Sequence, residues 1–460
     1  MAAACLLSAQ RRPLPLRLAV QRRLAQGLFQ PLGESTQEAA RAALEARVCR
    51  GFAMVFAEFA QIPSSLGYAL SMALDRKALD LCVDEFSQEL SALSRRIHAH
   101  PELCFEEHQA ATWLGDCLER ELGAKVERGV GGLATAFRAR IGSGSPRIAI
   151  LAEYDALPEI GHACGHNLIA GSAVGAFLAL ARQTKGFQGT VEIIGTPAEE
   201  GGGGKIKLLQ AGVFQGIDAA MMFHPFDRDI LAHPALCSMR IAMTYQGVPS
   251  HAAAAPFAGK SALTACMETF RLIDSQRVHF RDGVRVHGII TNGGQAVNVI
   301  VEHAASEFTL RAHSSAELER VKAIVLRCAR GAALACEVEV SFQEKPGYRE
   351  MRNNLTMARR FGAALEALGR NARETDPRVG AGSTDMGDLS LYLPSIHPYL
   401  AICDEGESLC HEHRFADCAA SDRGMSTMLV AAKAMARTTI DLLEDPKLLG
   451  DVRREFEAAR

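Results

Sequence analysis

The chain lacks a hydrophobic run long enough to cross a membrane. A spanning helix requires about 18 or more apolar residues, and the longest such run, Ala170 to Ala181, is shorter and rich in small side chains. The chain also lacks a basic segment interleaved with aromatic residues, and its 50 Lys and Arg nearly balance its 53 Asp and Glu. We therefore expect neither a membrane nor a nucleic acid as a partner.

The chain has no Cys-x-x-Cys pair, and its 13 cysteines are odd in number and scattered. This pattern indicates reduced thiols in an intracellular compartment rather than a disulfide framework. We expect a cytoplasmic protein. Mitochondria are the alternative, because residues 1–33 contain several arginines and no acidic residue, as transit segments do. A disordered extension explains residues 1–78 equally well.

Two glycine-rich stretches lack the residues that a nucleotide site requires. Gly129–Gly132 leads into a strand without the helix of a dinucleotide-binding turn. Gly201–Gly204 precedes Lys205, but no Ser or Thr follows the lysine as it does in a phosphate-binding loop. We expect no nucleotide cofactor.

From Leu79 onward, strand and helix patterns alternate, which indicates an α/β fold. The order of elements from about residue 237 to 345 is βαββαβ, the order of a ferredoxin-like unit. We therefore predict a zinc-exopeptidase-like catalytic domain with a mixed sheet, formed by 79–236 and 346–460, and an inserted lid or dimerisation domain over 237–345. Predicted elements of the first domain include helices over 83–100 and 169–183, a strand over 396–402 and a polar loop over 382–388.

The stretch LAEYDALPEIGHACGHN, from Leu151 to Asn167, follows a short apolar strand and is broken by turn residues. It places Cys164 and His166 two residues apart, and Zn²⁺ accepts thiolate and imidazole together. An isolated Cys-x-His is more often an ordinary loop, since a metal needs three or four ligands. The prediction therefore depends on further ligands elsewhere in the chain.

Two further predicted strands end in polar groups. The strand over 191–195 leads to Glu199 and Glu200, and the strand over 219–223 ends at His224. Two adjacent carboxylates are able to divide their tasks, one as metal ligand and the other as proton acceptor. Sites in α/β sheets lie beyond the carboxyl ends of the strands, so we expect these groups to converge on Cys164 and His166.

Several motifs occur in an order that is specific when they are taken together. They are RIHAHPEL from Arg96, YDALP from Tyr154, HACGH from His162, PAEEG from Pro197, SHA from Ser250 and a late loop histidine. From Leu79 to the C-terminus, the chain resembles the amidohydrolase branch of the peptidase M20 metallopeptidases. The resemblance implies a dipeptidase of peptide catabolism acting on β-alanyl-lysine and related dipeptides with a basic C-terminal residue.

The resemblance also implies the site residues and a site with two divalent metal ions. The implied ligands are Cys164, His166, Glu200, His224 and His411. The thiolate favours zinc, although such a mixed ligand set tolerates manganese.

The other implied roles fall on four residues. Glu199 would be the general base, and Asp155 would orient a ligand. His251 resembles the family histidine that crosses a homodimer interface and stabilises the reacting carbonyl oxygen. Asn298 resembles a residue of the inserted domain that binds the substrate carboxylate.

Two positions depart from the family pattern, and a third residue is an alternative to one of the implied ligands. Glu153 stands where other branches have a histidine ligand, and Asn167 stands where many relatives have aspartate. His413 competes with His411 in one loop, and the following residues align better with His411 as the ligand. Two other functions fit the same motifs: an aminoacylase-like hydrolase of N-acyl amino acids, and a catalytically silent binding protein.

Overall fold

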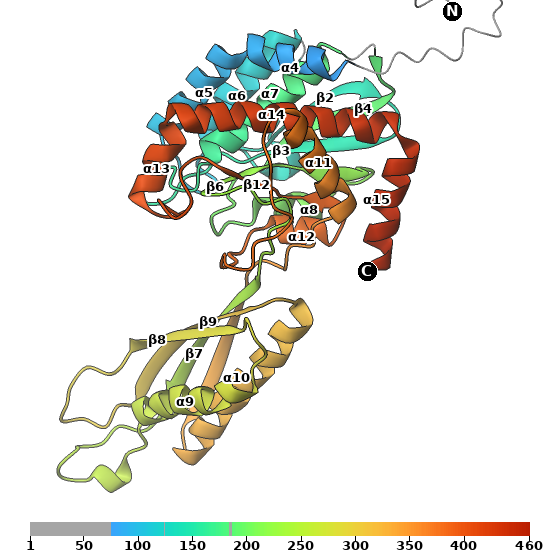
Figure 1. The fold of residues 1–460 in the computed structure, drawn as a ribbon. Coiled ribbons are helices and arrows are strands. Elements are labelled where there is room, and N and C mark those ends of the chain that lie inside the picture. Colours follow the sequence, from blue (N-terminus) through green and yellow to red (C-terminus); the bar gives the residue numbers. More distant parts are fainter. Residues whose placement is uncertain (1–74, 124, 184–185) are drawn as a thin grey trace, which may run out of the picture. The chain divides into compact units, whose positions relative to one another are not determined.

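The computed structural model describes residues 75–123, 125–183 and 186–460 (Figure 1), which belong to one compact unit of the chain. The predicted transit segment, and the one or two amphipathic helices that the sequence suggests between Glu34 and Leu74, lie outside the described residues. Among the helices that are described, none is long and apolar enough to cross a bilayer. All the cysteines within the same ranges are free thiols.

A six-stranded mixed sheet forms the centre of the first core, in the order β1-β2-β4-β3-β5-β11. Its strands are β1 (Glu127–Arg128), β2 (Phe137–Ser143), β3 (Arg147–Ala152), β4 (Gly189–Gly195), β5 (Ala219–Met221) and β11 (Ser395–Ile396). β3 runs parallel to β4 and β5, whereas β2 is antiparallel to β4. Strands buried on both faces explain the continuous apolar runs in the sequence.

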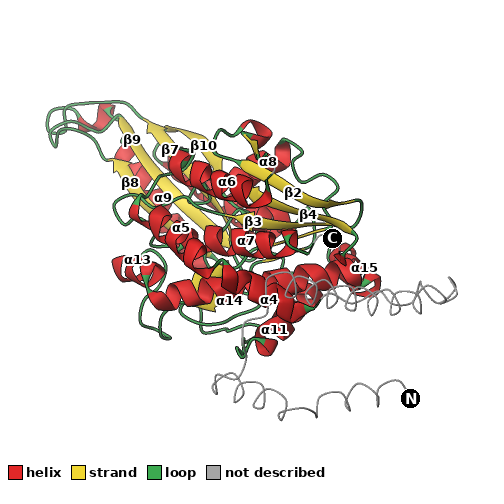
Figure 2. Cartoon of the chain, turned by 90° about the horizontal axis from the view of Figure 1, so that it is seen from above, coloured by secondary structure: helices red, strands yellow, loops and turns green. Residues whose placement is uncertain are grey.

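Helices cover this sheet (Figures 1 and 2). α7 (His166–Ala181) packs on β3 and β4, and α14 (Asp422–Glu444) packs against α7. A Cβ at Gly171 would lie 2.3 Å from Met428 Sδ, so any larger residue there would force the Met428 side chain to move. The other helices are α4 (Arg76–Glu85), α5 (Ser87–Ala99), α6 (His108–Leu122), α8 (Gly204–Gln210), α11 (Leu355–Ala367), α12 (Met386–Ser390), α13 (His413–Ala420) and α15 (Pro446–Ala458).

A second sheet has its own hydrophobic core and two helices, α9 (Ala262–Gln276) and α10 (Ser315–Ala335), which pack against it. Its strands are β7 (Cys237–Gln246), β8 (Arg285–Asn292), β9 (His303–Ala312) and β10 (Glu339–Pro346). All neighbours in the order β10-β7-β9-β8 are antiparallel. Along the chain the elements follow the order βαββαβ. The extent of an inserted domain, 237–345, stays a prediction.

Some predicted boundaries are wrong. The helix predicted over 83–100 is divided at Phe86 into α4 and α5, and the polar loop predicted over 382–388 ends in α12. The strand predicted over 396–402 is two short strands in different sheets. β11 extends the six-stranded sheet, and β12 (Tyr399–Ala401) pairs with β6 (His224–Phe226). Pro398 lies between them and has no N–H for a continuous ladder.

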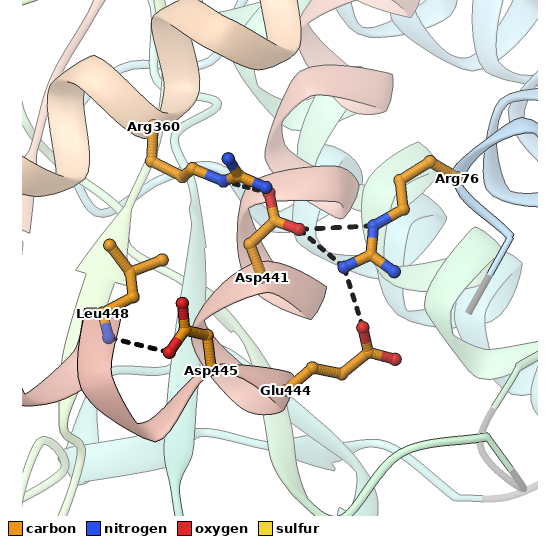
Figure 3. A pocket seen from close by; sticks show the side chains of 6 residues that line it. All are labelled: Arg76, Arg360, Asp441, Glu444, Asp445 and Leu448. Atoms are coloured by element: carbon orange, nitrogen blue, oxygen red, sulfur yellow. Dashed lines mark hydrogen bonds and ion pairs between the residues drawn. The ribbon is translucent and has the colours of Figure 1, made fainter. Parts of the chain in front are cut away.

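An ion-pair network joins helices that lie far apart in the sequence (Figure 3). Asp441 on α14 accepts from Arg76 on α4 and from Arg360 on α11. The Asp441 carboxylate is nearly buried, with 7% of its side chain exposed, and each of its oxygens accepts from a different arginine. The network therefore connects α4, the first described helix, to the C-terminal part of the core.

Candidate metal centre

The turn after β3 supplies the first two predicted ligands. Gly165 precedes α7 with φ of 75°, and a Cβ there would lie 2.8 Å from Pro225, so this position requires glycine. The sequence predicts that α7 starts at Ile169, but it begins at His166, which places that ring in the first helical turn. Both Cys164 and His166 are buried.

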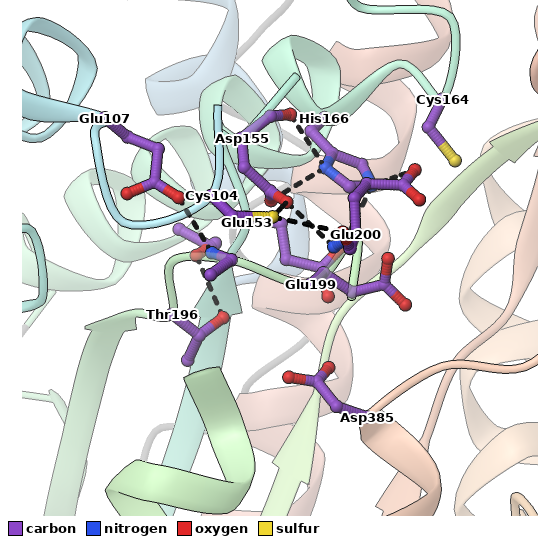
Figure 4. A network of polar contacts seen from close by, with 12 residues as sticks. Cys104, Glu107, Glu153, Asp155, Cys164, His166, Thr196, Glu199, Glu200 and Asp385 are labelled. Carbon is purple, nitrogen blue, oxygen red and sulfur yellow. Dashed lines mark hydrogen bonds and ion pairs between the residues drawn. The ribbon is translucent and has the colours of Figure 1, made fainter. Parts of the chain in front are cut away.

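The segment after β4 supplies the two carboxylates, and other side chains fix its backbone (Figure 4). Ala198 has a φ of 60°, unusual for a residue other than glycine, and its N–H donates to Glu107. The N–H of Glu200 donates to Asp155 Oδ2 at 2.9 Å. The backbone of this segment is therefore defined by contacts to side chains.

The remaining predicted ligands come from β6 and from the loop before α13. His224 begins β6, and its Nδ1 donates to the carbonyl oxygen of Pro225 at 2.7 Å. His411 has a φ of 72°, and its N–H donates to the Ala163 carbonyl at 2.9 Å. Both His411 and His413 are exposed, but His411 Nε2 lies 3.3 Å from Glu200 Oε1, whereas His413 starts α13 and belongs to no group of donors among the described residues, so His411 is the histidine of this loop that faces the cluster.

Donor atoms of these residues form three overlapping groups, each with its atoms within 4.8 Å of one another. The groups are Cys164, His166 and His224; Cys164, Glu200 and His411; and His166, Glu199 and Glu200. Cys164 Sγ lies 3.4 Å from His224 Nε2, and His411 Nε2 lies 3.3 Å from Glu200 Oε1. Separations of about 3–4 Å are typical of two ligands of one ion with bonds near 2 Å.

Two buried atoms of the cluster test whether a cation fits there. His166 Nε2 has no hydrogen-bond partner among the described residues, and Glu200 Oε1 lies 4.0 Å from it and 3.3 Å from His411 Nε2. Asp155 Oδ1 accepts from His166 Nδ1 at 3.0 Å, and in the neutral ring this donation leaves the lone pair on Nε2 for a metal. Unpaired buried acceptors are costly unless a ligand satisfies them. The residues present therefore fit a bound metal ion.

The electrostatics of the cluster also favour a cation. Burial raises the pKa of Glu199 well above its ordinary value, and the neighbouring carboxylates of Glu200 and Glu153 add to the rise. Burial lowers the pKa of His224 to about 3, which keeps its ring neutral and able to bind a metal. Contact with Cys410 and burial raise the pKa of Cys164, and a bound cation would oppose this rise.

Glu153, one of the two positions that depart from the family pattern, lies between a buried lysine and a proposed ligand. Glu153 Oε1 accepts from the buried Nζ of Lys205, which also donates to Asp385 Oδ1 at 2.6 Å. Burial opposes the charge on Lys205, but the two carboxylates outweigh it and raise the pKa of the lysine. The other oxygen of Glu153 lies 3.6 Å from His166 Nε2. Glu153 therefore forms a buried ion pair beside the site.

Asn167 makes structural contacts instead of facing the donor groups. Its amide donates to Ser94 Oγ at 3.0 Å and to the carbonyl oxygen of Ala419 at 3.1 Å. These bonds connect the start of α7 to α5 and α13. An aspartate could not donate them, which gives a physical reason for asparagine at this position.

His251 and Asn298 lie next to each other in the second core. His251 forms an isolated bridge with Val299, and the N–H of Ala252 donates to the carbonyl oxygen of Asn298 at 3.0 Å. Both side chains are exposed. Among the described residues, no hydrogen bond or ion pair joins either of them to the donor groups, so this pair is not assembled with the cluster.

Sequence reasoning missed three residues that support the site, namely Glu107, Lys205 and Tyr348. Glu107 Oε2 accepts from Thr135 Oγ1, and its Oε1 accepts from the N–H of Ala198. The glutamate pair in Phe105-Glu106-Glu107, which follows the Arg96 motif, was the available signal for Glu107. No local pattern marks the other two, because their partners lie far away in the sequence.

The chain matches peptidase family M20/M25/M40 over residues 149–438. It is 37% identical to the Xaa-Arg dipeptidase of Mus musculus over 84% of this chain and 92% of that protein. It is 36% identical to the Xaa-Arg dipeptidase of Homo sapiens over 82% and 90%, respectively. A solved dinuclear metal-binding M20 peptidase from Bacillus subtilis has the same fold, with a TM-score of 0.63, 23% identity and coverage of 78% of this chain and 99% of its own.

The extent of the family match and these identities decide the class of protein. The chain belongs to peptidase family M20/M25/M40. It is a hydrolase that acts on peptide or amide bonds, and the predicted α/β fold and family are confirmed.

Proposed function

We propose that this protein is a metal-dependent dipeptidase that hydrolyses dipeptides with a basic C-terminal residue, of the Xaa-Arg and β-alanyl-lysine type. The observation that carries the proposal is the convergence of thiol, imidazole and carboxylate donors around the buried His166 Nε2, which has no hydrogen-bond partner among the described residues. The two Xaa-Arg dipeptidases align with this chain over most of their length, and this similarity supports dipeptides with a basic C-terminal residue as the substrate class.

The metal ligands in this proposal are Cys164, His166, Glu200, His224 and His411. Two ions are proposed because the donors form more than one overlapping group with Cys164 in common. A thiolate among imidazoles and carboxylates favours zinc over manganese. When bound, such ions polarise an amide carbonyl and activate water for attack.

The side chains of this protein supply the proton transfers. Glu199 lies beside Glu200 and shares one donor group with it and with His166. In the proposed reaction, Glu199 takes a proton from the attacking water and then passes it to the leaving amine. Asp155 holds the ring of His166 and the N–H of Glu200, so it orients one ligand and the segment of the base.

The roles proposed for the second core require a second copy of the chain. His251 would stabilise the reacting carbonyl oxygen of a partner subunit, and Asn298 would bind the substrate carboxylate. Exposed apolar side chains on β8 and the following loop, namely Ile289, Ile290 and Val297, support a homodimer through this part of the chain.

The variant Glu199→Gln tests the proposed base. It keeps the shape of the side chain and removes the proton acceptor, so we expect kcat to fall by ~10²–10⁴ with metal content unchanged. The measurement is dipeptide hydrolysis with metal analysis of the same sample. The control is Glu457→Gln on the exposed face of α15, which should keep the wild-type rate. A Glu199→Gln enzyme with wild-type turnover would exclude this role.

A further inference from the structure

The segment that carries Glu199 has an unusual backbone. Ala198, Gly201 and Gly203 all have positive φ values, of 60°, 96° and 65°. A Cβ at Gly204 would lie 1.7 Å from the carbonyl oxygen of Pro197, so the chain approaches itself very closely here. Such a conformation persists only where surrounding contacts determine it.

One side-chain hydroxyl makes three of those contacts. Tyr348 donates its O–H to the carbonyl oxygen of Glu199. The hydroxyl oxygen of Tyr348 accepts from the N–H of Gly201 at 2.9 Å and from the N–H of Gly203 at 3.2 Å. The hydroxyl therefore holds both the residue of the proposed base and the turn that follows it.

The backbone of Tyr348 is itself fixed where the chain returns from the second sheet. Tyr348 follows β10 by two positions, and its carbonyl oxygen accepts from the N–H of Ser238 at 2.8 Å. The N–H of Gly347 donates to the carbonyl oxygen of Ser238 at 3.1 Å. Ser238 lies at the start of β7, so the outgoing and returning strands are hydrogen-bonded at this point.

We propose that Tyr348 is a positioning residue for Glu199, and that it connects the paired strands at Ser238 to the segment of the proposed base. This inference rests on the proposed function, because its kinetic consequence requires Glu199 to act as the base. Without the hydroxyl, the N–H of Gly203 loses its acceptor, and the Glu199 carbonyl loses a donor. The N–H of Gly201 then keeps only the Glu199 carbonyl, at 2.6 Å, as an acceptor. The carboxylate of Glu199 is then free to move away from the reacting atoms.

The test compares Tyr348→Phe with Tyr245→Phe. Tyr245 is the control, because its hydroxyl also donates a hydrogen bond, to Thr269 at 2.8 Å, but lies in the second core, where, among the described residues, it makes no contact with the segment of Glu199. We expect Tyr348→Phe to lower kcat by roughly tenfold or more, since a displacement of ~1 Å can cost ~10²-fold in rate. KM should stay within about twofold of wild type, since substrate binding is not altered.

A second measurement does not depend on turnover. Hydrogen exchange at the amide of Gly203 should be faster in Tyr348→Phe and unchanged in Tyr245→Phe. Unchanged exchange, or an unchanged kcat in Tyr348→Phe, would overturn the inference. A wild-type protein with bound metal but no hydrolysis of any dipeptide would overturn the proposed function, and the kinetic role of Tyr348 with it, while faster exchange would still establish the anchoring contact.

Discussion

Lys205 places a buried positive charge between two buried carboxylates at the edge of the candidate site. Its Nζ is fully buried and donates to Glu153 and to Asp385, whose pKa is raised to about 6 by burial. The backbone N–H of Lys205 also donates to Asp385, at 2.9 Å. Removing one member of such a group leaves an uncompensated charge in the interior.

We expect Lys205→Met to lower the free energy of unfolding by ~3–5 kcal/mol, because Glu153 and Asp385 lose their counter-charge. Chemical denaturation of the purified variant measures this change. Lys207→Met is the matched control on the same helix. That ammonium is exposed and lies over the Phe105 ring, 4.5 Å from its centroid, so its loss should cost no more than ~1 kcal/mol. Equal effects of the two substitutions would show that the buried ion pairs do not stabilise the fold.

Sequence reasoning predicted individual donors better than their supporting contacts. Cys164, Glu200 and His224 follow short apolar strands, and the rule that sites lie at strand ends was enough to expect them together. The residues around Lys205 indicate only an incomplete phosphate-binding loop. They do not indicate an ion pair, because the partner Asp385 is 180 positions away. Contacts of this kind depend on tertiary packing and leave no local signal.

At the scale of elements, periodicity predicted the long helices and buried strands and missed the short ones. The sequence pattern predicts a strand over 303–312 and a helix capped at Ser421 or Asp422 that reaches about Leu443, and β9 and α14 have nearly these bounds. Ser421 caps α14 by accepting from the N–H of Gly424. β6 and β12 are three residues long, and each exists because the other pairs with it. α8 begins among glycines that indicate a loop, and the ion pairs of Lys205 hold it in place.

The ion-pair network around Asp441 on α14 is expected to stabilise the packing of helices α4, α11 and α14. Asp441→Ala should lower the free energy of unfolding by ~1.5–3 kcal/mol, since a hydrogen bond to a charged group contributes that much. The turnover of the variant should not change, because α4, α11 and this end of α14 carry none of the proposed ligands. Thermal or chemical unfolding, followed by an activity assay on the same sample, checks both statements.

Asp451→Ala is the control for this change. Asp451 pairs with Arg454 on the surface of α15, and exposed pairs of this kind contribute ~0–1 kcal/mol. A loss of stability as large as that of Asp441→Ala would argue against a special contribution from the network. Loss of activity in a folded Asp441→Ala protein would mean that the network affects the site.

At the scale of the whole molecule, the proposed site has groups beside two different sheets. The metal-binding donors, Glu199 and Asp155 lie in the part of the chain that forms the six-stranded sheet, whereas His251 and Asn298 are exposed residues of loops between elements of the second sheet. The sequence order βαββαβ was sufficient to predict the elements of the second core. How its exposed residues meet a substrate depends on assembly, which no sequence pattern in one chain specifies.

The central claim is metal-dependent cleavage of dipeptides with a basic C-terminal residue. The most direct measurement is kcat/KM on one metal-analysed sample for β-alanyl-lysine, alanyl-arginine, alanyl-glutamate and N-acetyl-arginine. The account predicts that the two basic dipeptides are preferred by at least ~10-fold, and that chelation abolishes and zinc restores their hydrolysis. Preference for N-acetyl-arginine, or full activity after complete removal of metal, would contradict it.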